Sequence, residues 1–120
     1  MAFDVNAMLR PASAGAISAN GSGTGLKMGC DLLSRQYCVS VPGPVTGTTP
    51  TLDVVIEESD DNVTWRKFLN FEQITKSGQY YVRGQSNAKY RRASWTVGGT
   101  TPNFGVVKIG PVQAGIDTKY

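Results

Sequence analysis

The clearest alternation of apolar and polar residues lies in residues 51–69. Leu52, Val54 and Ile56 are separated by single residues, and this period of two is typical of a strand with one buried face. Residues 59–62 are short and polar, which favours a tight turn, because such side chains hydrogen-bond their own backbone. Residues 63–69 then supply a second run. The pattern predicts a β-hairpin with an acidic turn.

Further strands are predicted on both sides of this hairpin. Residues 36–41, 79–83, 89–97 and 104–109 alternate, residues 26–33 offer a shorter strand, and turns containing Gly or Pro separate them. No segment has the periodicity of an amphipathic helix of normal length. About seven to eight strands at this spacing are typical of a single antiparallel β-sandwich, of jelly-roll or immunoglobulin-like type. We therefore predict an all-β fold.

The predicted core takes the inward positions of these strands. Trp65 and Trp95 are included, since aromatic rings at strand spacing more often fill a core than form a sugar-binding platform. The full set is Tyr37, Val39, Leu52, Val54, Ile56, Trp65, Phe71, Val82, Trp95, Val97, Phe104 and Val106.

One short motif, Gly-Thr-Thr-Pro, occurs twice, at residues 47–50 and 99–102. Each copy is interpreted as a turn or loop that leads into a strand. The repetition predicts two strands that start at the same end of the structure, either side by side or in facing sheets.

The first 29 residues differ from the rest in composition, because they are rich in Ala, Gly, Ser and Asn. Such a segment buries little apolar surface, so we expect it to stand outside the core. Its glycine-rich part, residues 21–25, is interpreted as a linker. The expected organisation is an extended or partly disordered arm at 1–29, a sandwich domain at 30–112 and a C-terminal tail at 113–120.

The arm still contains bulky or charged side chains at intervals. Phe3, Met8, Leu9 and Arg10 are the candidates for contact with a partner. A partner surface can order such a segment through contacts of this kind. The alternative is a loose tail with a short edge strand.

Charge is close to balanced, with 12 Lys and Arg against 9 Asp and Glu and a net charge of +3 at pH 7. This excess of positive charge is mild, and acidic residues balance the basic cluster, so direct nucleic-acid binding is not expected. We interpret four basic residues as an exposed charged face that balances the acidic turn: Arg66, Lys89, Arg91 and Arg92.

The chain lacks the residue types of common catalytic sites. It has no histidine, which removes the usual general base and the commonest metal ligand. The sequence also lacks a phosphate-binding glycine loop before a helix. The acidic residues at 57–61 do not have the spacing of a calcium-binding EF-hand. We predict no catalytic residue, no metal site and no cofactor.

The sequence also suggests a compartment. No run approaches the roughly 20 apolar residues needed to cross a membrane, and residues 1–10 lack the pattern of a signal peptide. We expect synthesis in the cytoplasm and no membrane association. Cys30 and Cys38 are expected to be free rather than bridged, because the cytosol keeps thiols reduced.

Three stretches, residues 50–65, 80–92 and 96–107, together resemble small β-sandwich structural proteins of tailed bacteriophages, in particular capsid decoration (cement) proteins. The run Pro50-Thr-Leu-Asp-Val-Val-Ile-Glu-Glu-Ser-Asp-Asp-Asn-Val-Thr-Trp65 carries most of the likeness. The resemblance implies a non-enzymatic protein on the capsid surface of a virion. Its expected partners are the major capsid protein of the head and further copies of itself.

Two other functions stay open. Residues 56–65 also resemble the strand–turn–strand of discoidin-type, glycan-binding jelly rolls. A tail or head–tail connector component is the other alternative, and it requires ring-forming interfaces.

Overall fold

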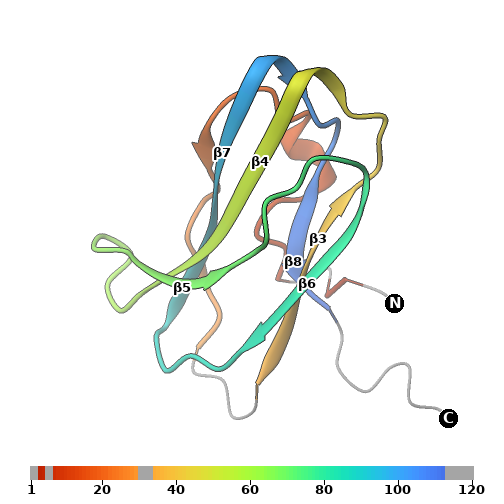
Figure 1. Ribbon diagram of the computed structural model, residues 1–120. Coiled ribbons are helices and arrows are strands. Elements are labelled where there is room, and N and C mark those ends of the chain that lie inside the picture. The colour runs from red at the N-terminus through yellow and green to blue at the C-terminus, as the bar shows by residue number, and fades with distance from the viewer. Residues whose placement is uncertain (1–2, 5–6, 30–33, 113–120) are drawn as a thin grey trace, which may run out of the picture.

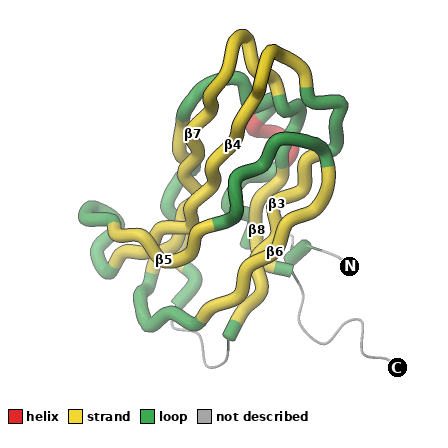
Figure 2. Tube along the Cα trace, viewed as in Figure 1, coloured by secondary structure: helices red, strands yellow, loops and turns green. Residues whose placement is uncertain are grey.

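The computed structural model describes residues 3–4, 7–29 and 34–112, and these are mostly β-structure. The strands form two antiparallel sheets, which lie face to face in Figures 1 and 2. The first sheet holds, in order, β1 (Gly21–Ser22), β7 (Tyr90–Asn103), β4 (Thr46–Ser59) and β5 (Arg66–Asn70), and β2 (Leu26–Lys27) also pairs with β7. The second sheet holds, in order, β6 (Gly78–Gly84), β3 (Arg35–Val41) and β8 (Lys108–Pro111). A short 3-10 turn, η1 (Ala12–Ala14), precedes β1. The prediction of an all-β sandwich is confirmed.

The core lies between the two sheets. Leu52, Val54 and Ile56 of β4 are buried in alternation, as the predicted hairpin requires, and Tyr37 and Val39 of β3 are buried opposite them. The rest of the buried cluster includes Leu9, Ile17, Val41, Phe71, Ile74, Ala93, Phe104, Val107 and Ile109. Four predicted core residues are only half-buried: Trp65, Val82, Trp95 and Val97. Burial of side chains from both sheets is the main source of stability in such a sandwich.

The last part of the predicted strand pattern is wrong. Residues 98–103 are not a turn but the end of β7, and β8 begins only at Lys108. Gly105 has a φ of 76°, which breaks the alternation after Phe104. Val106 is therefore 39% exposed, while Val107 faces the core. A period of two applies only to a continuous strand, and the glycine interrupts it.

The two Gly-Thr-Thr-Pro copies lie side by side, which was one of the two arrangements expected. They do not both lead into strands, however: residues 47–50 begin β4 and residues 99–102 end β7. Because β4 and β7 are antiparallel, the copies meet at one end of the ribbon, where Thr48 pairs with Thr100. These ends of β4 and β7 lie together at the top of the view in Figure 1.

The expectation that residues 1–29 stand outside the core is wrong for the described part of that segment. Leu9 and Ile17 are 3% and 1% exposed. The backbone supplies much of the attachment: Leu9 and Arg10 both donate N–H to the carbonyl of Ile109 on β8, and the carbonyl of Ile17 accepts from Phe104. The segment continues as β1 and β2 along β7. It therefore runs from the edge of one sheet to the edge of the other and closes one side of the sandwich.

Candidate functional site

The four basic residues expected on one exposed face do not share it. Lys89 and Arg66 are exposed, and Arg92 is half-buried. Arg91 is fully buried and donates to the carbonyls of Ala88, Gly29 and Ser86, so its assignment to an exposed face is wrong. Neighbouring residues of a strand point to opposite faces, which separates Arg91 from Arg92.

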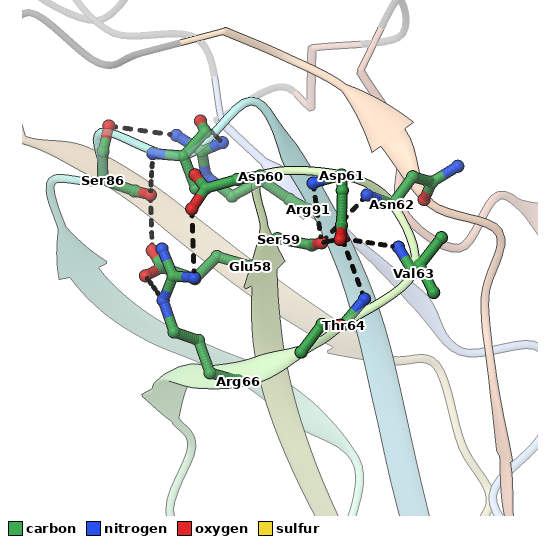
Figure 3. A network of polar contacts seen from close by, with 11 residues as sticks. Glu58, Ser59, Asp60, Asp61, Asn62, Val63, Thr64, Arg66, Ser86 and Arg91 are labelled. Carbon is green, nitrogen blue, oxygen red and sulfur yellow. Dashed lines mark hydrogen bonds and ion pairs between the residues drawn. The ribbon is translucent and has the colours of Figure 1, made fainter.

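The acidic turn between β4 and β5 is a hydrogen-bonded structural unit (Figure 3). One carboxylate oxygen of Asp61 accepts the backbone N–H groups of Val63 and Thr64 and the hydroxyl of Ser59, each at 2.9 Å. The bonds from Thr64 and then Val63 hold the pKa of Asp61 below its usual range. Asn62 follows with a φ of 63°, in the left-handed region that asparagine tolerates. The role of the Asp61 carboxylate is therefore structural: it holds the turn in shape by accepting these hydrogen bonds.

Beside the turn, the acidic residues Glu58 and Asp60 form ion pairs with a basic residue, Arg66. Arg66 Nε lies 2.7 Å from a carboxylate oxygen of Glu58, and its Nη1 lies 3.5 Å from Asp60. Ser86 donates its hydroxyl to the other oxygen of Glu58, as Figure 3 shows. Among the described residues, no group of three or more His, Cys, Asp or Glu is placed to hold a metal ion.

The glycine-rich residues 21–25 are not a linker, because the absence of side chains on their glycines makes room for two tryptophans. A Cβ on Gly21 would lie 3.1 Å from the Trp95 ring, and a Cβ on Gly25 would lie 2.8 Å from the Trp65 ring. Between them, a Cβ on Gly23 would lie 2.6 Å from the carbonyl oxygen of Leu9. Every second residue of this short run therefore passes close to another part of the chain.

Arg10 stacks on one of these tryptophans. Its guanidinium carbon lies 4.8 Å from the centre of the Trp95 ring, and Nη1 donates to the carbonyls of Val107 at 2.7 Å and Gly15 at 2.8 Å. Arg10 is 4% exposed, and its Nε is buried without a hydrogen-bond partner. Desolvation by burial lowers the pKa of Arg10, although a guanidinium stays protonated in proteins.

A cavity of about 500 Å³ lies beside this stack. One wall is formed by residues 8–11 and Ala14, the other by residues 22–26, and Trp95 completes it. Its surface is mostly apolar, from Met8, Leu9 and Leu26 among others. The cavity therefore combines apolar walls with one buried cation.

The second tryptophan carries a matching stack. The guanidinium carbon of Arg92 lies 4.5 Å from the centre of the Trp65 ring. Here Nε lies 2.7 Å from a carboxylate oxygen of Glu57, which is the residue directly opposite on β4. This second stack is thus an arginine, a tryptophan and a carboxylate.

The remaining residues expected in the arm lie near the same edge of the sandwich. Phe3 forms a bridge with Val112, and the amine of Lys108 lies 5.9 Å from its ring. Met8 is half-buried and lines the cavity, whereas Leu9 belongs to the core. The structure thus brings Met8, Leu9 and Arg10 together at one site.

Two further sequence expectations concern thiols and membranes. Cys38 is a free, buried thiol, and burial raises its pKa; Cys30 lies outside the described residues. In the part of the chain that the structure describes, no helix is long and apolar enough to cross a membrane.

Comparison with known proteins gives no relative. A scan against protein-family models found no match, and searches of curated proteins and of solved structures found none either.

Proposed function

We propose that this protein is a non-catalytic component of a bacteriophage virion, which decorates the head by docking on the capsid protein as a homo-oligomer. The proposal combines the sequence resemblance with one structural feature, the docking ribbon, defined as residues 46–51 of β4 and 98–103 of β7. The ribbon carries no charged residue. Eight of its residues are exposed: Thr46, Gly47, Thr48, Thr49, Gly99, Thr100, Thr101 and Asn103.

The docking ribbon extends beyond the strands that flank it. Within the described residues, β5 pairs with β4 only at 55–58, and β1 and β2 pair with β7 only at 90–95. Beyond Leu52, which bridges to Ile74, the ribbon is two strands wide. A narrow, uncharged ribbon of small side chains offers an exposed surface to a neighbouring protein.

The ribbon also has the same unusual backbone twice, which is the observation that carries the proposal. Thr49 and Thr101 have φ of 47° and 46°, a region that β-branched residues rarely adopt. Each hydroxyl donates to the carbonyl of the preceding threonine at 2.8 Å. Strain of this kind costs of order 1–3 kcal/mol per residue and tends to occur at functional positions.

Protein docking makes use of such a preformed surface. The two strained segments lie on paired strands, so the ribbon presents the same shape from both strands. A preformed surface loses little conformational entropy on binding, and many weak contacts on one shell act together through avidity. The glycine residues at 47 and 99 allow the close approach, because a Cβ at either would meet the opposite backbone.

Co-sedimentation with purified empty heads from a panel of tailed phages tests the proposal. The wild-type protein should pellet with heads, and the Thr48→Arg/Thr100→Arg variant should bind at least about tenfold more weakly, since two like charges would enter the contact. Thr75→Arg, at an exposed threonine outside the ribbon, is the matched control and should bind like wild type.

Three results would count against the proposal. If the double variant binds heads as tightly as the wild type, the docking ribbon is not part of the interface. If the protein binds none of the heads, the proposed location on the head is wrong. Binding to tail tubes instead would favour the tail or connector alternative. Sedimentation velocity of the protein alone would show whether it forms an oligomer before it docks.

A further inference from the structure

The Arg10 guanidinium is a buried cation that no carboxylate of the described residues contacts. Its Nη1 is occupied by two carbonyls, and no ion pair of Arg10 exists among the described residues. Nε is closed to solvent and unpaired, whereas Nη2 makes no hydrogen bond with the described residues and is not closed off. A buried charge is costly unless an opposite charge and hydrogen bonds compensate it. This side chain is therefore incompletely satisfied in the protein alone.

The unsatisfied edge of this side chain has a preferred ligand. Nε and Nη2 lie on one side of the planar guanidinium, and that side pairs with both oxygens of a carboxylate in the common two-bond arrangement. Elsewhere in this molecule the same chemistry is complete: Arg92, stacked on Trp65, directs its Nε to Glu57. Among the described residues, no carboxylate completes the Arg10–Trp95 stack in the same way.

The cavity that Arg10 lines is large enough to hold such a ligand. Its volume of about 500 Å³ falls within the range of small-molecule sites. Met8, Leu9 and Leu26 supply apolar surface for the body of a ligand, and Ser22 and Thr24 supply hydroxyls at its rim. A hydrophobic cavity with one placed charge selects a ligand that has an apolar body and one ionised group.

We propose that this cavity binds a carboxylate attached to a small apolar body, with the carboxylate on the Nε–Nη2 edge of Arg10 and the apolar part against Met8, Leu9 and Trp95. The carboxylate meets Nη2 first, and pairing with Nε requires a shift of the wall side chains. The site goes beyond the proposed function and does not depend on it. The carboxylate comes either from a free organic acid or from an acidic side chain of another protein.

Tryptophan fluorescence provides the measurement. The chain has two tryptophans, so Trp65→Phe leaves Trp95 as a single reporter inside the site. This variant is titrated with benzoate, with neutral benzamide and with inorganic phosphate. Benzoate should give a saturable change in Trp95 emission, and benzamide should bind at least about tenfold more weakly, because it lacks the charge.

Variants identify the group that binds. Arg10→Gln in the same background keeps a donor for the two carbonyls but removes the charge, and it should weaken benzoate binding by about tenfold or more. Arg92→Gln removes the other stacked arginine and should leave benzoate binding unchanged. If Arg10→Gln does not fold, Thr24→Phe blocks the rim of the cavity without touching Arg10, and it should also abolish binding.

Several outcomes overturn the proposal. They are equal affinity for benzamide and benzoate, tighter binding of phosphate than of benzoate, undiminished binding by both Arg10→Gln and Thr24→Phe, or no saturable signal with benzoate. A blocked peptide with one glutamate separates the sources of the carboxylate. Tighter binding of the peptide than of benzoate assigns the site to a protein side chain, and the reverse assigns it to a free acid.

Discussion

Two arginine–tryptophan stacks in this molecule use the same pair of residue types in different surroundings. The guanidinium carbon of Arg10 lies 4.8 Å from the centre of the Trp95 ring and that of Arg92 lies 4.5 Å from the centre of the Trp65 ring, so the two cation–ring distances are nearly equal. The guanidinium of Arg10 is buried and bonded to carbonyls, whereas the guanidinium of Arg92 is partly exposed and bonded to a carboxylate. Attraction between a cation and a ring is therefore not what distinguishes them.

The origin of each arginine explains the difference. Arg92 is on β7 directly opposite Glu57 of β4, and strand register brings opposite charges together in such a pair. Arg10 is in the segment that crosses between the sheets, where the nearest polar groups are main-chain carbonyls. The guanidinium of Arg92 is thus paired with a carboxylate from the neighbouring strand. The guanidinium of Arg10, in the crossing segment, has no carboxylate partner among the described residues.

Removing each arginine should give the largest contrast between the two stacks. Arg10→Ala leaves two carbonyls without their donor and opens space beneath Trp95, so we expect a loss of about 2–4 kcal/mol in the free energy of unfolding. Arg92→Ala removes a partly exposed ion pair and a ring contact, with an expected loss of about 0.5–1 kcal/mol. Urea unfolding followed by circular dichroism measures both.

The order of the two losses is the decisive point. A larger loss for Arg92→Ala than for Arg10→Ala would mean that the carboxylate pair, rather than the buried carbonyl bonds, governs stability. Lys89→Ala, at an exposed position near Arg92, serves as the control and should change the free energy of unfolding by less than about 0.5 kcal/mol.

Much of the sandwich could be predicted from the sequence, because its strands alternate. Leu52, Val54 and Ile56 show the period of two directly, and the structure confirms their burial. The attachment of residues 7–29 could not be predicted in this way. Backbone hydrogen bonds to β8 and β7 hold that segment. Every residue type except proline can make such bonds, so amino-acid composition does not predict them.

The candidate site was partly visible in the sequence. Trp95 and Val97 were expected to face inward, and the same period of two should have placed Arg91 inward as well. The glycines at 21, 23 and 25 also alternate, which indicates a strand with one bare face rather than a linker. The contact of Arg10 with Trp95 joins residues far apart in the chain, and no local pattern predicts it.

Filling the space under each tryptophan should again destabilise the protein to different extents at the two stacks, although by less than removal of the arginines. Gly21→Ala forces a methyl group against Trp95, which Arg10 and the core hold in place, so we expect a loss of about 1–2 kcal/mol. Gly25→Ala overlaps the side-chain oxygen of Asn62 first and then the Trp65 ring, but Asn62 is exposed and Trp65 is only half-buried, so both side chains can move outward. We expect a loss below about 1 kcal/mol.

Unfolding midpoints and fluorescence together test this difference. Gly25→Ala should shift the emission of Trp65 in a Trp95→Phe background, because the ring moves. Ser22→Ala, an exposed position in β1, is the control and should be neutral. A greater loss of stability for Gly25→Ala would show that Trp65 is as firmly held as Trp95.

Acidification should affect only the stack beside the acidic turn. The pKa of Asp61 is lowered in the folded protein by the bonds from Thr64, Val63 and Ser59, relative to its ordinary value of 3.8. A lowered folded pKa means that the carboxylate stabilises the turn fully above the ordinary value, and that this contribution is lost as the pH falls through the folded value. Trp65 follows this turn directly, so it should report the change.

Single-tryptophan variants make the test specific. In Trp95→Phe, the emission of Trp65 should change as the pH is lowered below about 4, and Asp61→Asn should remove most of that response because its side chain does not titrate. In Trp65→Phe, the emission of Trp95 should stay constant over the same range, since Arg10 and its carbonyl partners do not titrate there. A parallel change of both tryptophans would show that the two stacks respond to acid as one unit, against the separation that their surroundings imply.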